Sequence, residues 1–337
     1  MIKISSRFAL NNKCRRALIA SAIAFTGILF IIPALAQGVY PNKPIKIIVP
    51  FAPGGQTDNM TRVFAKVLGE RLGQPIVIEN RPGAGGNIGS AIGAQSAPDG
   101  YTLLAGFDGT LVINPHVYSK MPFDTLKDLT PITNLGVGGL VLVAHPSVAA
   151  NDLKSLIALL KAKPGSLSYG TAGTGSTAHL AGELFNARAD VKMEHVPYKG
   201  GGSAVTDVLG GHIPLMYTSI STVQQYIKQG KLKGIAVSSP RRSSVLPDVP
   251  TFSEMGVSDF FVTSWVGLVA PAGTPKAIID KLHQESVAAL QSKEVRDQYA
   301  VFGFETIGNT PEQYGSQIRE DLVRWGAMVK LAKVPMQ

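Results

Sequence analysis

The sequence predicts an α/β protein built from two lobes. Short β-rich runs alternate with helix-periodic runs along most of the chain, which is typical of sheets with helices on both faces. Without an N-terminal targeting segment the chain has about 300 residues, more than one core usually holds, so we expect two domains. Two apolar β-rich segments, residues 140–143 and 263–269, are suited to carry the chain from one domain to the other and back.

The segments between these two crossings repeat a β-rich run paired with a helix-periodic run. The β-rich runs are residues 167–171, 194–197, 213–217 and 232–237. The helix-like runs are residues 155–161, 176–185, 203–209 and 222–229. Outside the crossings we expect strands at residues 45–49, 76–78 and 101–104, and amphipathic helices at residues 276–292 and 311–330. The predicted bounds are therefore residues 38–139 plus 265–337 for a discontinuous first lobe and residues 140–264 for the second.

The N-terminal residues have the features of a secretory signal peptide. Residues 1–16 contain five basic side chains and no acidic one, residues 17–32 are almost wholly apolar, and Ala34-Leu35-Ala36 supplies the small residues of a cleavage site. We expect cleavage after Ala36, which makes residues 1–36 a targeting segment. The alternative is an uncleaved membrane anchor, because the apolar run is slightly long for a signal. Arg15-Arg16 also partly fits a twin-arginine export signal.

Composition excludes several classes of function. The only cysteine, Cys14, precedes the apolar run, so we expect neither disulfides nor thiolate chemistry in the mature chain. The formal charge of +9 falls to +4 without the five basic residues of the signal, because 27 basic residues then face 23 acidic ones. Basic residues do not cluster with aromatic ones, which argues against nucleic-acid binding. The six histidines lack metal-ligand spacing, so no metal site and no cofactor are expected.

The first expected strand is followed by a loop that suits a small anion. After residues 45–49 the chain passes through the PGG motif of residues 53–55, and apolar residues then recur with helical spacing until Gly73, a C-terminal stop. Thr57 or Asp58 is the expected N-cap. Such a loop presents the unpaired N–H groups and the positive dipole end of a helix, and its glycines let a ligand approach the main chain.

Three more glycine-rich loops follow the same plan, at residues 80–87, 169–176 and 197–203. Together they predict a cleft lined by helix N-termini. Residues 173–178 also match a short dinucleotide-binding pattern, but an exported protein meets no supply of soluble nicotinamide cofactor, so we prefer a helix-capping anion loop. The motifs of P-loop nucleotide hydrolases and α/β-hydrolases do not occur.

Several side chains near these loops have two possible roles each. His179 either faces a ligand or bonds a neighbouring loop, and we favour the second reading. Tyr198 and Lys199 either donate to a carboxylate or lie in a solvent-facing loop. Phe107 and Asp108 follow an expected strand and would meet the far end of a ligand. Asp108 can also cap the next segment, which we consider the better reading.

The order of these motifs resembles the Bug-type solute-binding receptors of tripartite tricarboxylate transporters. The resemblance covers essentially the whole mature chain and is carried by YPNKPIKIIVPFAPGGQTD, IENRPGAGGNIG, YGTAGTGSTAHLAGELF and VPYKGGGSAVTDVLGGHI, among others. It implies a two-lobed, type II-like periplasmic-binding-protein fold, in which each lobe has a mixed, mostly parallel sheet flanked by helices and the ligand cleft lies between the lobes. It also implies a periplasmic, non-enzymatic monomer that captures a small carboxylate for transport or sensing, with the membrane subunits of the transporter as further partners.

The resemblance and the loops together define the predicted ligand contacts. They are Phe51, Ala52, Pro53, Gly54, Gly55, Thr57, Asp58, Gly86, Asn87, Gly106, Phe107, Asp108, Ala172, Gly173, Gly175, Ser176, Thr177, His179, Tyr198, Lys199 and Thr218. Residues 107–110 stand where relatives often carry small hydroxyl residues, so the resemblance does not name the carboxylate. The alternative function is a secreted α/β enzyme acting on a small carboxylate. The sequence offers anion donors for a receptor but no paired nucleophile and base for such an enzyme.

Overall fold

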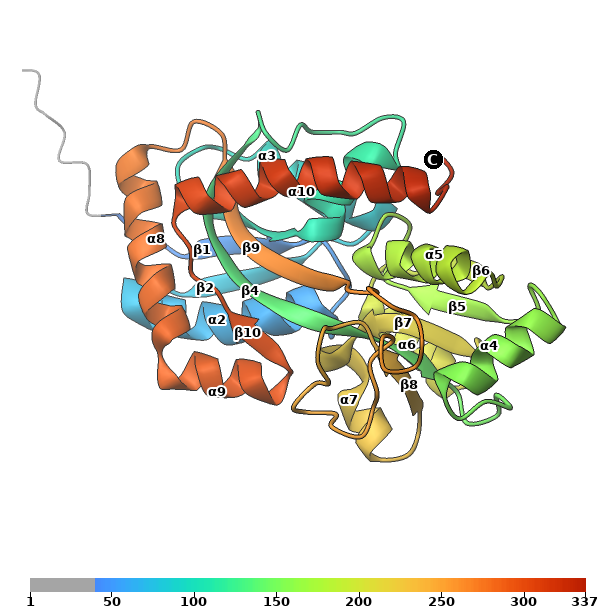
Figure 1. Cartoon of the computed structure of the whole chain (residues 1–337). Coiled ribbons are helices and arrows are strands. Elements are labelled where there is room, and N and C mark those ends of the chain that lie inside the picture. The colour runs from blue at the N-terminus through green and yellow to red at the C-terminus, as the bar shows by residue number, and fades with distance from the viewer. Residues whose placement is uncertain (1–39) are drawn as a thin grey trace, which may run out of the picture. The chain divides into compact units, whose positions relative to one another are not determined.

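The computed structural model describes residues 40–337, which fall into two units divided between Asn42 and Lys43. Of the first unit only residues 40–42 are described, and they form neither helix nor strand. The signal peptide predicted for residues 1–36 lies outside the described residues. The fold below is that of the second unit, Lys43–Gln337 (Figure 1).

This unit is organised around one sheet of ten strands, in the order β2-β1-β3-β9-β4-β7-β5-β6 with β8 and β10 also paired to β4. The strands are β1 Ile45–Val49, β2 Ile76–Asn80, β3 Thr102–Phe107, β4 Leu129–Ala144, β5 Ser168–Thr171, β6 Glu194–Pro197, β7 Leu215–Ser219, β8 Lys233–Val237, β9 Thr263–Pro271 and β10 Phe304–Thr306. The α/β class predicted from the alternating pattern is confirmed.

The sheet is mixed, and its antiparallel pairs all contain β4 or β9. Strand β1 is parallel to β2 and β3, and β5 is parallel to β6 and β7, as expected for strands joined through helices. Strand β9 is antiparallel to β3 and β4, and β4 is antiparallel to β7, β8 and β10. The described sheet is therefore less parallel than the sequence predicts, because the two crossing strands pair so extensively.

Strand β4 joins the two halves of the sheet. Its residues from Leu129 to Gly139 pair with β9, and those from Leu140 to Ala144 pair with β7 (Figure 1). We call the part containing β1, β2, β3, β9 and β10 the first half, and the part containing β5 to β8 the second half. With this naming, β4 passes from the first half to the second at residue 140. The lobe bounds given above remain a prediction.

Helices flank both halves of the sheet. They are α2 Gln56–Leu72, α3 Asn87–Ala94, α4 Leu153–Ala162, α5 Thr177–Ala189, α6 Gly201–Leu209, α7 Ile220–Lys228, α8 Lys276–Gln291, α9 Lys293–Val301 and α10 Pro311–Leu331. In the first half α2 packs against α8 and α9, and α10 packs on β4, whereas α5, α6 and α7 pack on β7. Within residues 40–337, no helix combines the length and the apolar character needed to cross a bilayer.

The helix after β1 begins two or three residues earlier than predicted, since the expected N-cap was Thr57 or Asp58. Gly55, in an extended conformation with φ −84° and ψ 176°, is the N-cap of α2, and the helix ends at Gly73 as expected. Thr57 and Asp58 therefore lie inside the first turn and not at the cap. Asp58 instead turns its carboxylate back to accept a hydrogen bond from the Gly54 N–H at 3.0 Å, which fixes the glycine loop onto the helix.

Candidate functional site

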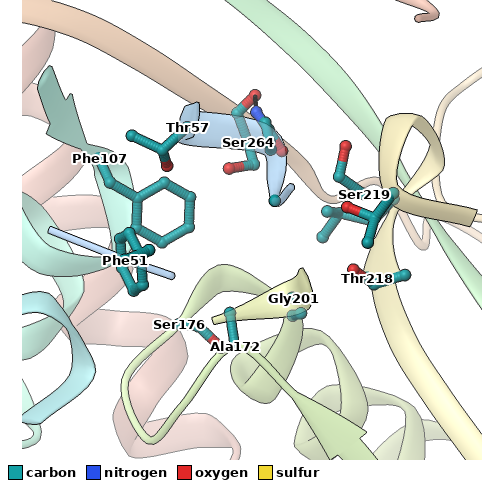
Figure 2. Close-up of a pocket in the computed structure, with 14 residues that line it drawn as sticks. Phe51, Thr57, Phe107, Ala172, Ser176, Gly201, Thr218, Ser219 and Ser264 are labelled. Carbon is teal, nitrogen blue, oxygen red and sulfur yellow. Dashed lines mark hydrogen bonds between the residues drawn. The ribbon is translucent and has the colours of Figure 1, made fainter. Parts of the chain in front are cut away.

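A small pocket lies where the strand ends of the two halves meet (Figure 2). Fourteen residues line it, namely Phe51, Gly55, Gln56, Thr57, Phe107, Leu140, Ala172, Ser176, Ala178, Gly201, Thr218, Ser219, Thr222 and Ser264. None of these lining residues carries a charged side chain. Any charged ligand bound here must therefore meet backbone dipoles and neutral side chains.

Four helices present their N-termini to this pocket. Their contributions are Gly55, Gln56 and Thr57 of α2, Ser176 and Ala178 of α5, Gly201 of α6, and Ser219 and Thr222 of α7. The first N–H groups of a helix have no acceptor within the helix, and the helix dipole adds positive potential there. Only α5 has a side-chain cap, because Ser176 accepts from the His179 N–H, whereas α2, α6 and α7 have none. Such an arrangement favours an anion.

The pocket has one aromatic end and one hydroxyl-bearing end. Phe51 and Phe107 meet edge to face with ring centroids 5.0 Å apart, and both rings are buried. Thr218 and Ser219, at the end of β7, lie on the opposite side of the pocket from these rings (Figure 2). A ligand in the pocket therefore meets aromatic rings and the nearby Thr57 hydroxyl at one end, and the hydroxyls of Thr218 and Ser219 at the other.

Hydrogen bonds join the two halves around the pocket. The Ala52 N–H donates to the carbonyl of Lys199 at 3.1 Å, and the Tyr118 hydroxyl donates to the carbonyl of Thr174 at 3.2 Å. The loops approach so closely that a Cβ at Gly202 would lie 2.1 Å from the Pro53 carbonyl oxygen. Glycine is therefore required at this contact for the halves to meet.

Asp108 lies behind the pocket and is fully buried. Its Oδ1 accepts hydrogen bonds from the Gly109 N–H at 2.7 Å, the Thr177 hydroxyl at 2.7 Å and the Ser264 hydroxyl at 2.9 Å, and its Oδ2 accepts one from the Trp265 N–H at 3.2 Å. Burial raises the pKa of Asp108 to about 7, although these donors act to lower it. The Asp108 side chain caps the turn at residues 109–113, which is the role that the sequence analysis favoured.

Asp58 shapes the first loop in a comparable way. Burial alone would raise its pKa, but hydrogen bonds from Arg62, the Gly54 N–H and Asn80 outweigh burial and hold the pKa of Asp58 below its ordinary value. The carboxylate therefore stays ionised and bonded within the loop. It does not line the pocket.

His179 bonds the third glycine-rich loop. Its Nδ1 accepts the Gly175 N–H at 3.2 Å, and its ring stacks on His195 with centroids 3.9 Å apart. His195 in turn pairs its Nε2 with the Thr171 hydroxyl at 2.7 Å. Burial lowers the pKa of His179 to about 4, and burial together with the neighbouring His179 lowers that of His195 to about 3. Both rings are neutral at neutral pH and hold the loop in place.

The comparisons with known proteins agree with this geometry. The family model described as "Tripartite tricarboxylate transporter family receptor" (TctC) matches residues 60–334. The chain is 40% identical to Protein BugT of Bordetella pertussis over 93% of its own length and 96% of that protein. It belongs to the tripartite tricarboxylate transporter receptor family.

Two solved structures of similar proteins hold carboxylates. An R. palustris protein with adipate has a TM-score of 0.86 at 31% identity, with 88% of this chain and 100% of that chain covered. MatC from Rhodopseudomonas palustris with bound malate has a TM-score of 0.82 at 32% identity, with 86% of this chain and 100% of that chain covered. The periplasmic binding protein BugD is a third structural neighbour, with a TM-score of 0.85 at 33% identity and with 88% of this chain and 100% of that chain covered.

The structure brings together some of the predicted contacts and places the others around them. The predicted residues that line the pocket of this TctC-family chain are Phe51, Gly55, Thr57, Phe107, Ala172, Ser176 and Thr218. Those that lie outside the lining are Ala52, Pro53, Gly54, Asp58, Gly86, Asn87, Gly106, Asp108, Gly173, Gly175, Thr177, His179, Tyr198 and Lys199. Their contact with a ligand stays a prediction.

Among these outer residues, the side chains of Tyr198 and Asn87 are hydrogen-bonded to other protein groups, and Lys199 is exposed to solvent. The Tyr198 hydroxyl donates to the carboxylate of Asp207 at 2.6 Å, which turns it toward α6. Lys199 is exposed, and only its carbonyl takes part in a cross-pocket bond. Asn87 accepts from the Asn114 amide at 2.7 Å, inside the second glycine-rich loop region. Among the described residues no group of three or more His, Cys, Asp or Glu side chains is placed to hold a metal ion.

Sequence reasoning missed half of the lining. The missed residues are Gln56, Leu140, Ala178, Gly201, Ser219, Thr222 and Ser264. Ser219 and Thr222 begin a helix directly after a strand, as the glycine-rich loops do, but their junction contains no glycine and so went unnoticed. Ser264 reaches the pocket from the far crossing strand, where its carbonyl accepts from the Gln56 amide at 3.0 Å.

Proposed function

We propose that this TctC-family chain is a periplasmic receptor that binds a small carboxylate and presents it to the membrane subunits of a tripartite tricarboxylate transporter. The observation that carries the proposal is a pocket with three uncapped helix N-termini and no charged lining side chain. Backbone N–H groups at helix starts bind carboxylates without a cationic partner. The adipate and malate bound to similar proteins support the same class of ligand.

In this proposal the first turns of α2 and α5 anchor one carboxylate group. Thr57 and Ser176 add hydroxyls beside the main-chain donors, and both side chains are buried at the pocket wall. Donors that are fixed by helices need no reordering when the anion arrives, so little entropy is lost on binding. A neutral donor set also lets the ligand leave again, which transport requires.

The proposed lobes, residues 38–139 plus 265–337 and residues 140–264, would close on the ligand. The cross-pocket bonds from Ala52 to Lys199 and from Tyr118 to Thr174 are the contacts that closure would make and opening would break. We propose that the chain acts as a monomer in the periplasm, exported by its N-terminal segment. Hinge closure around a ligand is a usual motion of such two-lobed proteins.

The alternative of a secreted enzyme receives less support. Hydroxyls of Ser and Thr line the pocket, but a nucleophilic hydroxyl needs a neighbouring base, and no lining residue is a His, Asp, Glu or Lys. Asp108 is close, yet four donors already occupy its carboxylate. A binding role requires only hydrogen-bond donors, and the hydroxyls and helix N-termini at the pocket supply them.

A thermal-shift screen of the mature chain tests the proposal. Aliphatic and aromatic mono-, di- and tricarboxylates are added to protein that has been unfolded, dialysed and refolded to remove carried ligand. A bound carboxylate at about a hundredfold over its dissociation constant stabilises the native state by about 2.7 kcal/mol, or about 5 °C in melting temperature. A flat response across the whole panel, or consumption of any carboxylate by the protein, would contradict the proposed function.

A further inference from the structure

Asp108 is a buried acid without a cationic partner. Its side chain is fully buried, and among residues 40–337 no cationic side chain pairs with it. The groups that donate to its carboxylate are all neutral and come from Gly109, Thr177, Ser264 and Trp265. Neutral donors offset the loss of hydration only in part, which is why burial raises the pKa of Asp108 to about 7. Near neutral pH the side chain therefore exists in both its charged and its uncharged form.

The side chains that face this region from α10 bring no free positive charge to Asp108. The Tyr314 hydroxyl is buried, and burial, followed by the charges of Asp108 and Asp321, raises the pKa of Tyr314 well above its ordinary value. Asp321 accepts a hydrogen bond from the Trp265 indole at 2.7 Å and forms an ion pair with Arg324 at 2.8 Å. The Arg324 guanidinium is therefore already paired, and Tyr314 stays neutral.

The titratable groups in the first turns of α5 and α2 hold a constant charge near neutral pH. Strands β3 and β9, which flank Asp108, contain no titratable side chain. On α5, burial lowers the pKa of His179 to about 4, so its ring is neutral. On α2, burial would raise the pKa of Asp58, but hydrogen bonds from Arg62 and other donors hold it below its ordinary value. Of these groups, Asp108 is the one that changes charge close to pH 7.

Ser264 connects Asp108 to the pocket. It lines the pocket (Figure 2), and its hydroxyl lies 2.9 Å from the Asp108 Oδ1. A ligand that contacts Ser264 is thus separated from the Asp108 carboxylate by one side chain. No charged side chain lines the pocket, and buried surroundings screen charges much less than water does. An anionic ligand and an ionised Asp108 therefore repel each other, so the ligand favours the protonated form of Asp108.

The direction of the hydrogen bond between Ser264 and Asp108 depends on the charge of the acid. An ionised carboxylate only accepts, so the single hydroxyl proton of Ser264 is committed to Asp108. A proton on Oδ1 needs an acceptor, which the hydroxyl oxygen of Ser264 or Thr177 supplies. If Ser264 accepts, its own proton becomes available to a ligand in the pocket. Protonation of Asp108 thus removes a repulsion and frees a hydroxyl donor.

We propose that the binding of an anionic ligand in the pocket is coupled to the uptake of a proton by Asp108, so that capture strengthens as the pH falls. The inference rests on the proposed function, because the pocket must hold a carboxylate. The proton comes from solvent and forms an O–H bond on the Asp108 carboxylate, while the ligand stays ionised. Since the ligand favours protonated Asp108, protonation favours the ligand by the same factor. The receptor would load its ligand at lower pH and release it at higher pH.

Calorimetry on the mature chain, with the tightest monocarboxylate or dicarboxylate from the thermal-shift screen, tests the coupling. Such ligands stay ionised between pH 6.5 and 8.5, so they contribute no proton of their own. Titrations at pH 7.5 in HEPES and in Tris, whose enthalpies of ionisation differ, give the number of protons taken up. We expect an uptake of about half a proton per ligand at pH 7.5, because free Asp108 is already partly protonated there. The dissociation constant should rise at least about fivefold from pH 6.5 to pH 8.5.

Variants of two buried acids assign the proton to Asp108. Asp108→Asn removes the titratable group with little change of shape, so the uptake should vanish and the dissociation constant should change less than about twofold over the same pH range. Asp108→Ser also removes the charge and serves should Asp108→Asn fail to fold. Asp58→Asn is the matched control, because Asp58 is buried near the pocket but already ionised, so the uptake should persist in it.

Two outcomes would overturn the coupling and leave the receptor function standing. One is ligand binding by the wild type without proton uptake. The other is an uptake that persists in the Asp108 variants, which would assign the proton to another group. Failure of every carboxylate to bind would overturn both the coupling and the proposed function.

Discussion

The hydroxyl of Thr177 donates to the buried carboxylate of Asp108 at 2.7 Å, and this bond joins the end of β3 to the first turn of α5. The same carboxylate accepts from Ser264 and from the Trp265 N–H on β9. Asp108 thus holds three chain segments together directly behind the pocket. Its surroundings explain why an acid is tolerated in a core position.

Removing the Thr177 hydroxyl should destabilise the fold. Thr177→Val leaves Asp108 with one donor fewer, and we expect a loss of about 1 to 2 kcal/mol in the free energy of unfolding, since a donor to a buried charge is removed. Thr177→Ser, which keeps the hydroxyl, is the matched control and should lose less. Urea unfolding at pH 8 measures both. Equal stabilities of Thr177→Val and the wild type would show that the bond is dispensable.

Burial of Asp108 predicts that stability falls as the pH rises from about 4 to 7. Its pKa is raised from 3.8 to about 7, so the folded protein keeps a proton that the unfolded chain releases in this range. At about 1.4 kcal/mol per pH unit, the loss is on the order of 4 kcal/mol. Asp108→Asn should abolish this component in urea unfolding between pH 4.5 and 8. An unchanged pH dependence in the variant would contradict the assignment.

Burial of His179 should make the stability rise with pH over part of the same pH range. Its pKa falls from 6.5 in the unfolded chain to about 4 in the folded protein, so its contribution to stability is present above about pH 6.5 and is lost as the pH falls toward 4. The loss is on the order of 3 kcal/mol. The two pH dependences partly cancel in the wild type. The contribution of His179 to the free energy of unfolding is therefore best measured in the Asp108→Asn variant. There, His179→Gln should reduce the slope between pH 4.5 and 6.5, and the slope that remains should include the contribution of His195, whose pKa is lowered over the same range. A profile that keeps its slope would assign the trend to another group.

The sequence predicted the class of fold and one side of the pocket because those features are local. A strand, two glycines and a helix in succession are enough to expect an anion loop at residues 53–58, whatever the rest of the chain does. The predicted N-cap was wrong, because Gly55 caps the helix and Asp58 lies in its first turn, where it accepts hydrogen bonds from Arg62 and from the Gly54 N–H. The pair of Asp58 and Arg62, four residues apart, is visible in the sequence and could have served as a warning.

The other side of the pocket depends on contacts between distant residues. Ser264 meets Gln56 only because β9 runs beside both β3 and β4, and no local pattern gives this pairing. Thr222 looks like an ordinary helix residue until Gly201 is placed beside it. The extent of antiparallel pairing was underestimated for the same reason, since β4 and β9 pair with each other across more than one hundred residues.

The central claim is that helix N-termini, and not a cationic side chain, bind the carboxylate. Calorimetry with the tightest carboxylate found in the screen tests it with three variants. Gly55→Pro removes the N–H at the α2 N-cap and Gly55→Ala keeps it, while Lys199→Ala removes the cation predicted nearest the loops. We expect Gly55→Pro to weaken binding at least about tenfold, and Gly55→Ala and Lys199→Ala to change it less than about threefold. Loss of binding in Lys199→Ala, with retention in a folded Gly55→Pro protein, would contradict the account.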